Sequence, residues 1–171
     1  VMYEILIKGG RLVDGSGSPW FQADVAISGG KVVKIGRGLD GAALTIDAAG
    51  KVVSPGFIDA HTHSDVSLLS WPRAESKVFQ GVTTEVIGNC GSSPLPVGEY
   101  LSKLDRQGVA VNVVPLVRFG TLRKAVMGED TDRPATKEER AKMRSLVEEA
   151  VSQGAFGMST MVDFTSKPQG I

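Results

Sequence analysis

Residues 54–63 read Ser-Pro-Gly-Phe-Ile-Asp-Ala-His-Thr-His, and the hydrophobic pattern of the chain changes at this stretch. The turn residues Ser54-Pro55-Gly56 precede a short apolar strand, predicted over residues 57–61, that ends in polar side chains. Helices and strands alternate after this point, which is typical of βα units on a parallel sheet. The later strands are predicted at residues 82–88, 109–114 and 156–159, and the helices at residues 97–107 and 136–153.

The chain before this stretch has a different pattern. Residues 3–53 alternate apolar and polar side chains in short runs, with glycine-rich turns predicted at Gly9-Gly10 and Gly29-Gly30. This pattern predicts a small sheet or sandwich. We therefore predict two domains, a small β domain over residues 1–55 and successive βα units over residues 56–171.

The composition excludes several classes of protein. The chain has 171 residues, of which 42% are hydrophobic and 22% charged, so it is able to bury a core. Its 19 basic and 19 acidic side chains give no net charge, which argues against binding to nucleic acid or to a membrane surface. A single cysteine excludes a disulfide within the chain, and no apolar run approaches the ~18 residues of a membrane span. No signal peptide is visible, so we expect a cytoplasmic protein.

His61 and His63 are the two histidines of the chain, and they follow the predicted strand at residues 57–61. Residues i and i+2 of a strand face the same way, about 6.6 Å apart, so two imidazoles at this spacing can converge on one Zn²⁺. The ends of strands in βα units are also where such folds place their sites. The alternative is a pair of surface histidines, or histidines that only support a site.

Cys90 follows the next predicted strand, and three interpretations of it stay open. A lone cysteine is often a small hydrophobic residue of the core. At the mouth of a neighbouring parallel strand, it could instead reach a metal held by the histidines, which would deprotonate the thiol. It could also be a nucleophile with His61 or His63 as its base.

Other charged residues lie close in sequence to these candidates or to the later predicted strands. Asp59 and Asp65 lie two residues before His61 and two after His63, so either could orient an imidazole; the alternative is a cap or turn aspartate. Arg118, Arg123 and Lys124 are predicted to form a solvated face rather than an anion site.

The sequence resembles a known superfamily over nearly its whole length. Residues 52–63 resemble the first barrel strand of the amidohydrolase superfamily, and residues 7–15 resemble the small β domain that precedes the barrel. Residues 81–91, Gly-Val-Thr-Thr-Glu-Val-Ile-Gly-Asn-Cys-Gly, are similar to the D-aminoacylase branch, the N-acyl-D-amino-acid deacylases. Residues 112–123 and 154–160 also resemble that branch.

This resemblance implies an α/β fold, with a small β-sandwich-like domain followed by about four strands of a (β/α)₈ TIM barrel. A complete barrel needs ~250 residues, so the chain is expected to be an N-terminal fragment that contains only part of the site. His61, His63 and Cys90 match metal ligands of the family, and the cofactor implied is one or two Zn²⁺ ions. The family's further histidines and its general base are expected beyond Ile171.

The activity implied is hydrolysis of the amide bond of small N-acyl-D-amino acids, with this fragment inactive alone and able to self-associate through its unpaired barrel edge. Two departures from the family affect the substrate class. Arg118-Phe119-Gly120 stands where relatives often carry Gly-His-Gly, and Met161–Phe164 stands where many carry Gly-Leu-x-Tyr. The alternative functions are a cysteine-nucleophile hydrolase and a non-catalytic fragment that binds a partner.

Overall fold

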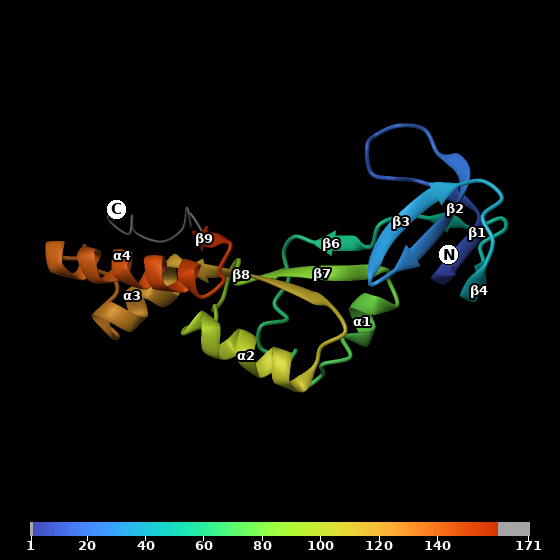
Figure 1. Ribbon diagram of the computed structural model, residues 1–171. Helices are drawn as coiled ribbons and strands as arrows, with labels where there is room; N and C mark the ends of the chain where they lie inside the picture. The colour runs from blue at the N-terminus through green and yellow to red at the C-terminus, as the bar shows by residue number, and fades with distance from the viewer. Residues whose placement is uncertain (1, 161–171) are drawn as a thin grey trace. The chain divides into compact units, whose positions relative to one another are not determined.

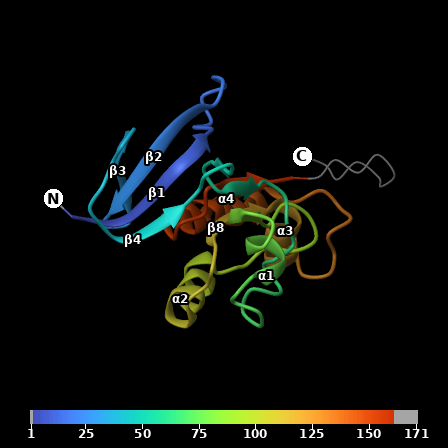
Figure 2. The same ribbon diagram turned by 90° about the vertical axis from the view of Figure 1, so that its right-hand side faces the viewer.

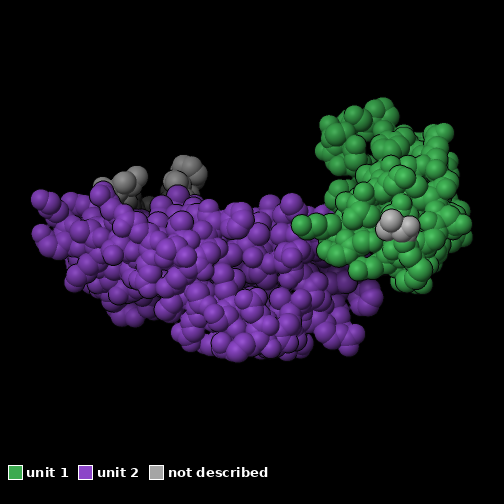
Figure 3. Space-filling model, in the orientation of Figure 1, with its two compact units in different colours: residues 1–55 green, residues 56–171 purple. Residues whose placement is uncertain are grey.

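The computed structural model describes residues 2–160, drawn in Figure 1. The chain divides into two compact units, residues 1–55 and residues 56–171, which Figure 3 colours separately. None of the helices between residues 2 and 160 combines the length and the apolar character that a membrane crossing requires.

The first unit is one sheet built around its first strand. Strand β1 pairs antiparallel with β2 on one side and parallel with β4 and β5 on the other, and β3 extends the sheet beyond β2. Leu6, Ala26 and Leu39 form one small buried cluster, and Leu12, Ala23 and Val25 form a second. The strands are β1 (Tyr3–Leu12), β2 (Phe21–Ser28), β3 (Lys31–Gly36), β4 (Ala42–Asp47) and β5 (Val52–Val53).

The turn predicted at Gly9-Gly10 is wrong, because β1 runs through both glycines as one strand. The pairing with β2 shifts register between Ile7 and Gly10, and Gly9 has a φ of 74°, so the glycines form a bulge. The buried Asp24 carboxylate accepts the Gly9 amide at 2.8 Å, and this hydrogen bond is the main cause of its lowered pKa. A glycine pair thus bends the strand without ending it.

The second unit has the parallel sheet that the strand–helix alternation predicts. Four strands lie side by side in the order β6-β7-β8-β9, and every pairing is parallel. They are β6 (Phe57–Asp59), β7 (Val82–Ile87), β8 (Asn112–Arg118) and β9 (Gly157–Ser159). The helices between them are α1 (Glu75–Val78), α2 (Val97–Gln107), α3 (Phe119–Met127) and α4 (Lys137–Ser152).

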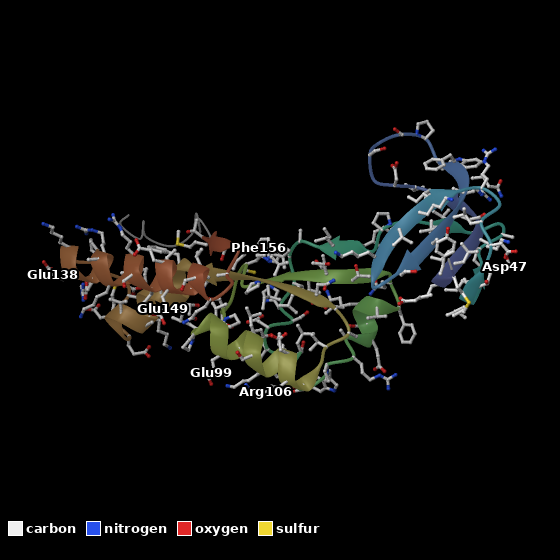
Figure 4. All side chains as sticks on the ribbon, in the orientation of Figure 1. Asp47, Glu99, Arg106, Glu138, Glu149 and Phe156 are labelled. Atoms are coloured by element: carbon white, nitrogen blue, oxygen red, sulfur yellow. The ribbon has the colours of Figure 1, made fainter. Side chains whose placement is uncertain are left out.

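Helices α1 and α2 lie on one side of this sheet (Figures 1 and 2). Ile87 of β7 is fully buried against Tyr100 and Leu104 of α2, which places these three in one core cluster. Glu99 and Arg106, on the other face of α2, point away from the sheet (Figure 4). A second cluster joins α3 and α4 to the strands, with Val117, Leu122, Met143 and Ala150 among its buried members.

Candidate metal centre

His61, His63 and Cys90 lie just beyond the ends of two neighbouring parallel strands. Strand β6 ends at Asp59, two residues earlier than predicted, so both histidines belong to the segment that follows it. Cys90 lies three residues after the end of β7 at Ile87. Since β6 and β7 run parallel, their carboxyl ends meet at one edge of the sheet, and the three side chains come together there.

The three side chains converge through their ligand atoms. Cys90 Sγ lies 3.0 Å from His61 Nε2 and 3.1 Å from His63 Nε2. The two rings stack, with centroids 5.7 Å apart and planes 22° from parallel. Within residues 2–160, this is the one group of three histidine, cysteine or acidic side chains whose ligand atoms all lie within 4.8 Å of one another.

The donor set fits a zinc ion, and its spacing comes close to what zinc requires. With Zn–S of ~2.3 Å and Zn–N of ~2.0–2.1 Å, tetrahedral coordination separates sulfur and nitrogen by about 3.6 Å. The observed 3.0 and 3.1 Å are shorter, so the ligand atoms need to open by about half an ångström around an ion. Both histidines are exposed and Cys90 is half-buried, so the cluster is also accessible to a small molecule.

Hydrogen bonds tie the histidine segment to the end of β7. The Thr62 amide donates to Val86 O at 3.2 Å. The Asn89 side chain donates to Ala60 O at 3.2 Å and to Val86 O at 3.0 Å, so it links the residues before His61 to those before Cys90. These bonds hold the two ligand-bearing segments together.

The turn that carries Cys90 depends on Gly88. Its φ of 79° lies in the left-handed region, which favours glycine. A Cβ at this position would lie 2.1 Å from Leu116 O, a backbone atom of the neighbouring strand β8. Gly88 therefore lets the chain leave β7 close against β8 and bring Cys90 to the histidines.

The two aspartates bind groups other than the imidazole rings. Asp59 accepts Lys77 Nζ at 2.5 Å and the His61 backbone amide at 3.2 Å, and the Lys77 hydrogen bond is the main cause of its lowered pKa. Asp65 accepts the Ser92 hydroxyl at 3.1 Å. Asp59 thus supports His61 through the backbone, whereas Asp65 holds the loop that follows Cys90.

The basic residues near the site differ from the predicted solvated face. Arg123 is only 2% exposed, and its guanidinium donates to the carbonyls of Thr131 and Arg133. Arg118 donates to Gly91 O at 2.6 Å, next to Cys90, whereas Lys124 is exposed, as predicted. The prediction is therefore wrong for Arg123. The departure noted at Met161–Phe164 lies outside the described residues.

Sequence reasoning missed a buried polar group behind the histidines. Thr62 and Ser64 are buried, whereas His61 and His63 are exposed, as an alternating chain requires. The Thr62 hydroxyl lies 2.7 Å from the Ser64 hydroxyl and donates to Glu85 of β7 at 3.3 Å. The sequence held one indication of this group, namely Glu85, the single acidic residue within the apolar strand predicted at residues 82–88.

Comparison with known proteins places this site in a family. Residues 44–166, well over half of the chain, match the Amidohydrolase family. The chain belongs to the amidohydrolase family. The match begins in β4 and covers all four strands of the second unit, so it includes the three candidate ligands of this amidohydrolase chain.

Individual relatives show which members of the family the chain is similar to. The amidohydrolase chain is 42% identical to N-acyl-D-aspartate deacylase of Alcaligenes xylosoxydans xylosoxydans, over 92% of this chain and 36% of the relative. A crystal structure of D-aminoacylase is 38% identical, with a TM-score of 0.86 over 92% of this chain and 38% of the other. N-acyl-D-glutamate deacylase from Bordetella bronchiseptica, solved with zinc and a phosphonate inhibitor, is 34% identical with a TM-score of 0.86, over 94% and 38%.

These matches confirm the resemblance to the D-aminoacylase branch and the predicted fold. The amidohydrolase chain has a small β domain followed by the first part of a (β/α)₈ barrel. It spans a little over a third of the length of the relatives it matches.

Proposed function

We propose that His61, His63 and Cys90 are ligands to one or two Zn²⁺ ions in an enzyme that hydrolyses the amide bond of N-acyl-D-amino acids. The observation that supports this most is the convergence of two Nε2 atoms and one Sγ atom within 4.8 Å at the carboxyl edge of a parallel sheet. The relatives named as deacylases of N-acyl-D-amino acids, one of them solved with zinc, support the substrate class and the metal.

Bound zinc would polarise the amide carbonyl and lower the pKa of a bound water towards 7. The chain's own residues supply the donor atoms for it. His61 and His63 must be neutral at Nε2 to donate a lone pair, and Cys90 must release its proton and become a thiolate. With one Zn²⁺ bound, the thiolate and two neutral imidazoles would leave a net positive charge at the site, which would favour an anionic substrate. The general base is proposed to lie outside this chain, as are the remaining ligands.

A cysteine-nucleophile hydrolase is the second candidate, because Cys90 Sγ lies within hydrogen-bonding distance of an imidazole. A nucleophile needs one base, usually oriented by a third group. Here two imidazoles face the same sulfur at nearly equal distances, and no hydrogen bond between described residues reaches the far nitrogen of either ring. This arrangement favours a ligand set over a nucleophile and its base.

The test uses a longer polypeptide that carries this chain together with the rest of the barrel. We expect bound zinc in the purified protein, and hydrolysis of an N-acetyl-D-amino acid but not of its L enantiomer. Removing the metal with a chelator should abolish turnover, and added Zn²⁺ should restore it. Full activity without metal, lost on alkylation of Cys90, would overturn the proposal in favour of the cysteine hydrolase.

The proposed ligand role also bears on location. Cys90 can bind metal only as a free thiol, and free thiols persist in reducing compartments. We therefore propose the cytoplasm as the site of action, with a small N-acyl amino acid as the partner. A fusion to a fluorescent protein, followed by cell fractionation, tests this.

A further inference from the structure

Glu85 is a fully buried acidic side chain in the middle of strand β7, with 0% of its surface exposed. One carboxyl oxygen accepts the Thr62 hydroxyl at 3.3 Å, and the other, Oε1, has no hydrogen-bond partner among the described residues. Burying a carboxyl group with half of its acceptors unpaired is unfavourable, and an apolar side chain of similar size would stabilise the fold better. Stability alone therefore does not account for Glu85.

Thr62, the partner of Glu85, is the residue between the two histidines. Its amide donates to Val86 O and its side chain donates to Glu85, so two consecutive residues of β7 hold it. The Ser64 hydroxyl, 2.7 Å away, extends the chain of hydroxyl groups beyond His63. Because Thr62 occupies the donor end of the bond to Glu85, Ser64 is left to donate to Thr62.

Because side chains alternate along this segment, the buried contact of Thr62 with Glu85 also determines where the two histidine rings lie. Consecutive side chains of an extended segment point to opposite faces. A Thr62 side chain held inward, against Glu85, therefore keeps the His61 and His63 side chains on the other face. There both Nε2 atoms lie 3.0–3.1 Å from Cys90 Sγ.

We infer that Glu85 is a positioning residue of the metal centre, acting as the hydrogen-bond acceptor that fixes Thr62 and thereby the spacing of the two imidazoles. The inference rests on the proposed function for its metal, but the positioning itself is a property of the chain. Partners that orient metal ligands typically account for 10–100-fold in metal affinity. Glu85 positions the two imidazoles from the side of the sheet that faces the helices.

The test separates stability from metal affinity, because the metal affinity should fall while the stability should not. Glu85→Met keeps the volume but removes the acceptor. We expect it to weaken Zn²⁺ binding by about 10–100-fold in competition with a chromophoric chelator, while the midpoint of urea unfolding stays unchanged or rises. Glu85→Gln keeps a carbonyl acceptor and should retain most of the affinity.

Partner variants identify the contact responsible. Thr62→Val, which removes the hydroxyl, should match Glu85→Met, and the double variant should be no weaker than either single variant. Thr62→Ser, which keeps the hydroxyl, should bind zinc more tightly than Thr62→Val and about as tightly as wild type. Tyr100→Phe is the matched control, because it removes a buried hydroxyl that has no hydrogen-bond partner among the described residues, and it should leave zinc affinity unchanged.

A metal-free measurement keeps this inference separate from the proposed function. With two histidines in the chain, nuclear Overhauser effects between the rings report their stacking directly. We expect these signals in the metal-free wild-type chain and in Glu85→Gln, and their loss in Glu85→Met. Zinc bound equally by wild type and Glu85→Met, or ring contacts preserved in Glu85→Met, would overturn the inference. A wild-type chain with stacked rings but no zinc binding would overturn only the proposed function.

Discussion

Cys90 is the residue on which the candidate centre depends most, because its sulfur lies 3.0 Å from the His61 ring and 3.1 Å from the His63 ring. Cys90→Ala should reduce the affinity for Zn²⁺ by more than the 10–100-fold that is typical of supporting partners, since a ligand atom itself is lost. Titration of the metal-free chain with Zn²⁺ measures this. Ser102→Ala, which removes an exposed hydroxyl on α2, is the control. Equal affinity in Cys90→Ala and wild type would exclude a thiolate ligand.

For single residues, the sequence predicted where the side chains lie better than it predicted their hydrogen-bond partners. The spacing of His61 and His63, and the place of Cys90 after the next strand, allowed the three side chains to meet, and the family resemblance favoured this over the other interpretations of Cys90. The burial of Arg123 was not predictable, because its carbonyl partners at Thr131 and Arg133 belong to a loop with no recognisable motif. Likewise, alternation indicates that Thr62 faces inward, but only the register of β6 against β7 shows that Glu85 is there to accept its hydroxyl.

Helix α4 begins with a capping box whose strength should depend on pH. The Thr136 side chain accepts the Glu139 amide, and Glu139 accepts the Thr136 amide and binds Arg133 with both carboxyl oxygens. The Arg133 guanidinium, followed by the Thr136 amide, lowers the pKa of Glu139 from 4.5 to about 2. A carboxyl group with a lowered pKa stabilises the folded state above its unfolded pKa, and this contribution is lost as the pH falls through the folded value.

We therefore expect the unfolding midpoint to fall as the pH is lowered from about 4.5 towards 2, with part of the fall due to Glu139. Glu139→Gln should remove that part, so the difference between variant and wild type should shrink as the pH falls. Urea unfolding followed by circular dichroism measures it. Glu138→Gln, in the same helical turn but exposed, is the control. A difference that stays constant with pH would contradict the assignment.

The turn after β7 should tolerate no side chain at Gly88. Gly88→Ala adds a left-handed strain of about 1–3 kcal/mol together with a clash against Leu116 O. Gly108→Ala is a matched control, because Gly108 also has a positive φ, of 75°, but has open space around it. The free energy of unfolding should fall more in Gly88→Ala, and only that variant should lose zinc affinity. Equal losses in the two variants would show that backbone strain alone matters at Gly88.

Local patterns predicted the clear elements and missed those that depend on packing. Thr136 and Glu139 marked the start of α4 within one residue, because a capping box is read from neighbours in sequence. Helix α3 was missed, since its amphipathic pattern is short and two basic residues obscure it. The sequence around the glycine pair in β1 predicts a turn, because the bulge exists only through pairing with β2 and the hydrogen bond from Gly9 to Asp24.

At the scale of the whole chain, the outer strands of the parallel sheet carry exposed apolar side chains. Phe57 and Ile58 of β6 are 61% and 66% exposed, and Phe156, which precedes β9, is 79% exposed. Within residues 2–160, β6 pairs only with β7, and β9 only with β8. Unpaired edges with apolar side chains favour association between copies.

We expect the 171-residue chain to self-associate as its concentration rises, which sedimentation velocity can follow. Ile58→Lys should weaken this association by placing a charge on the β6 edge. Val151→Lys, at an exposed apolar position on α4, is the control and should have little effect. A chain that stays monomeric at all concentrations, or equal effects of the two variants, would show that the sheet edge is not responsible.

The central place of β1 in its sheet has a consequence for synthesis on the ribosome. β1 is made before all of its partners. β2, on one side, is complete at Ser28, but β4 and β5 on the other side end only at Asp47 and Val53. At translation rates of 5–20 residues per second, that second edge waits roughly one to five seconds for its partners. During this interval, the nascent chain has an open strand edge that the finished sheet closes. Neighbouring ribosomes on one messenger RNA would therefore bring the open β1 edges of several nascent chains close together before any of these chains has folded.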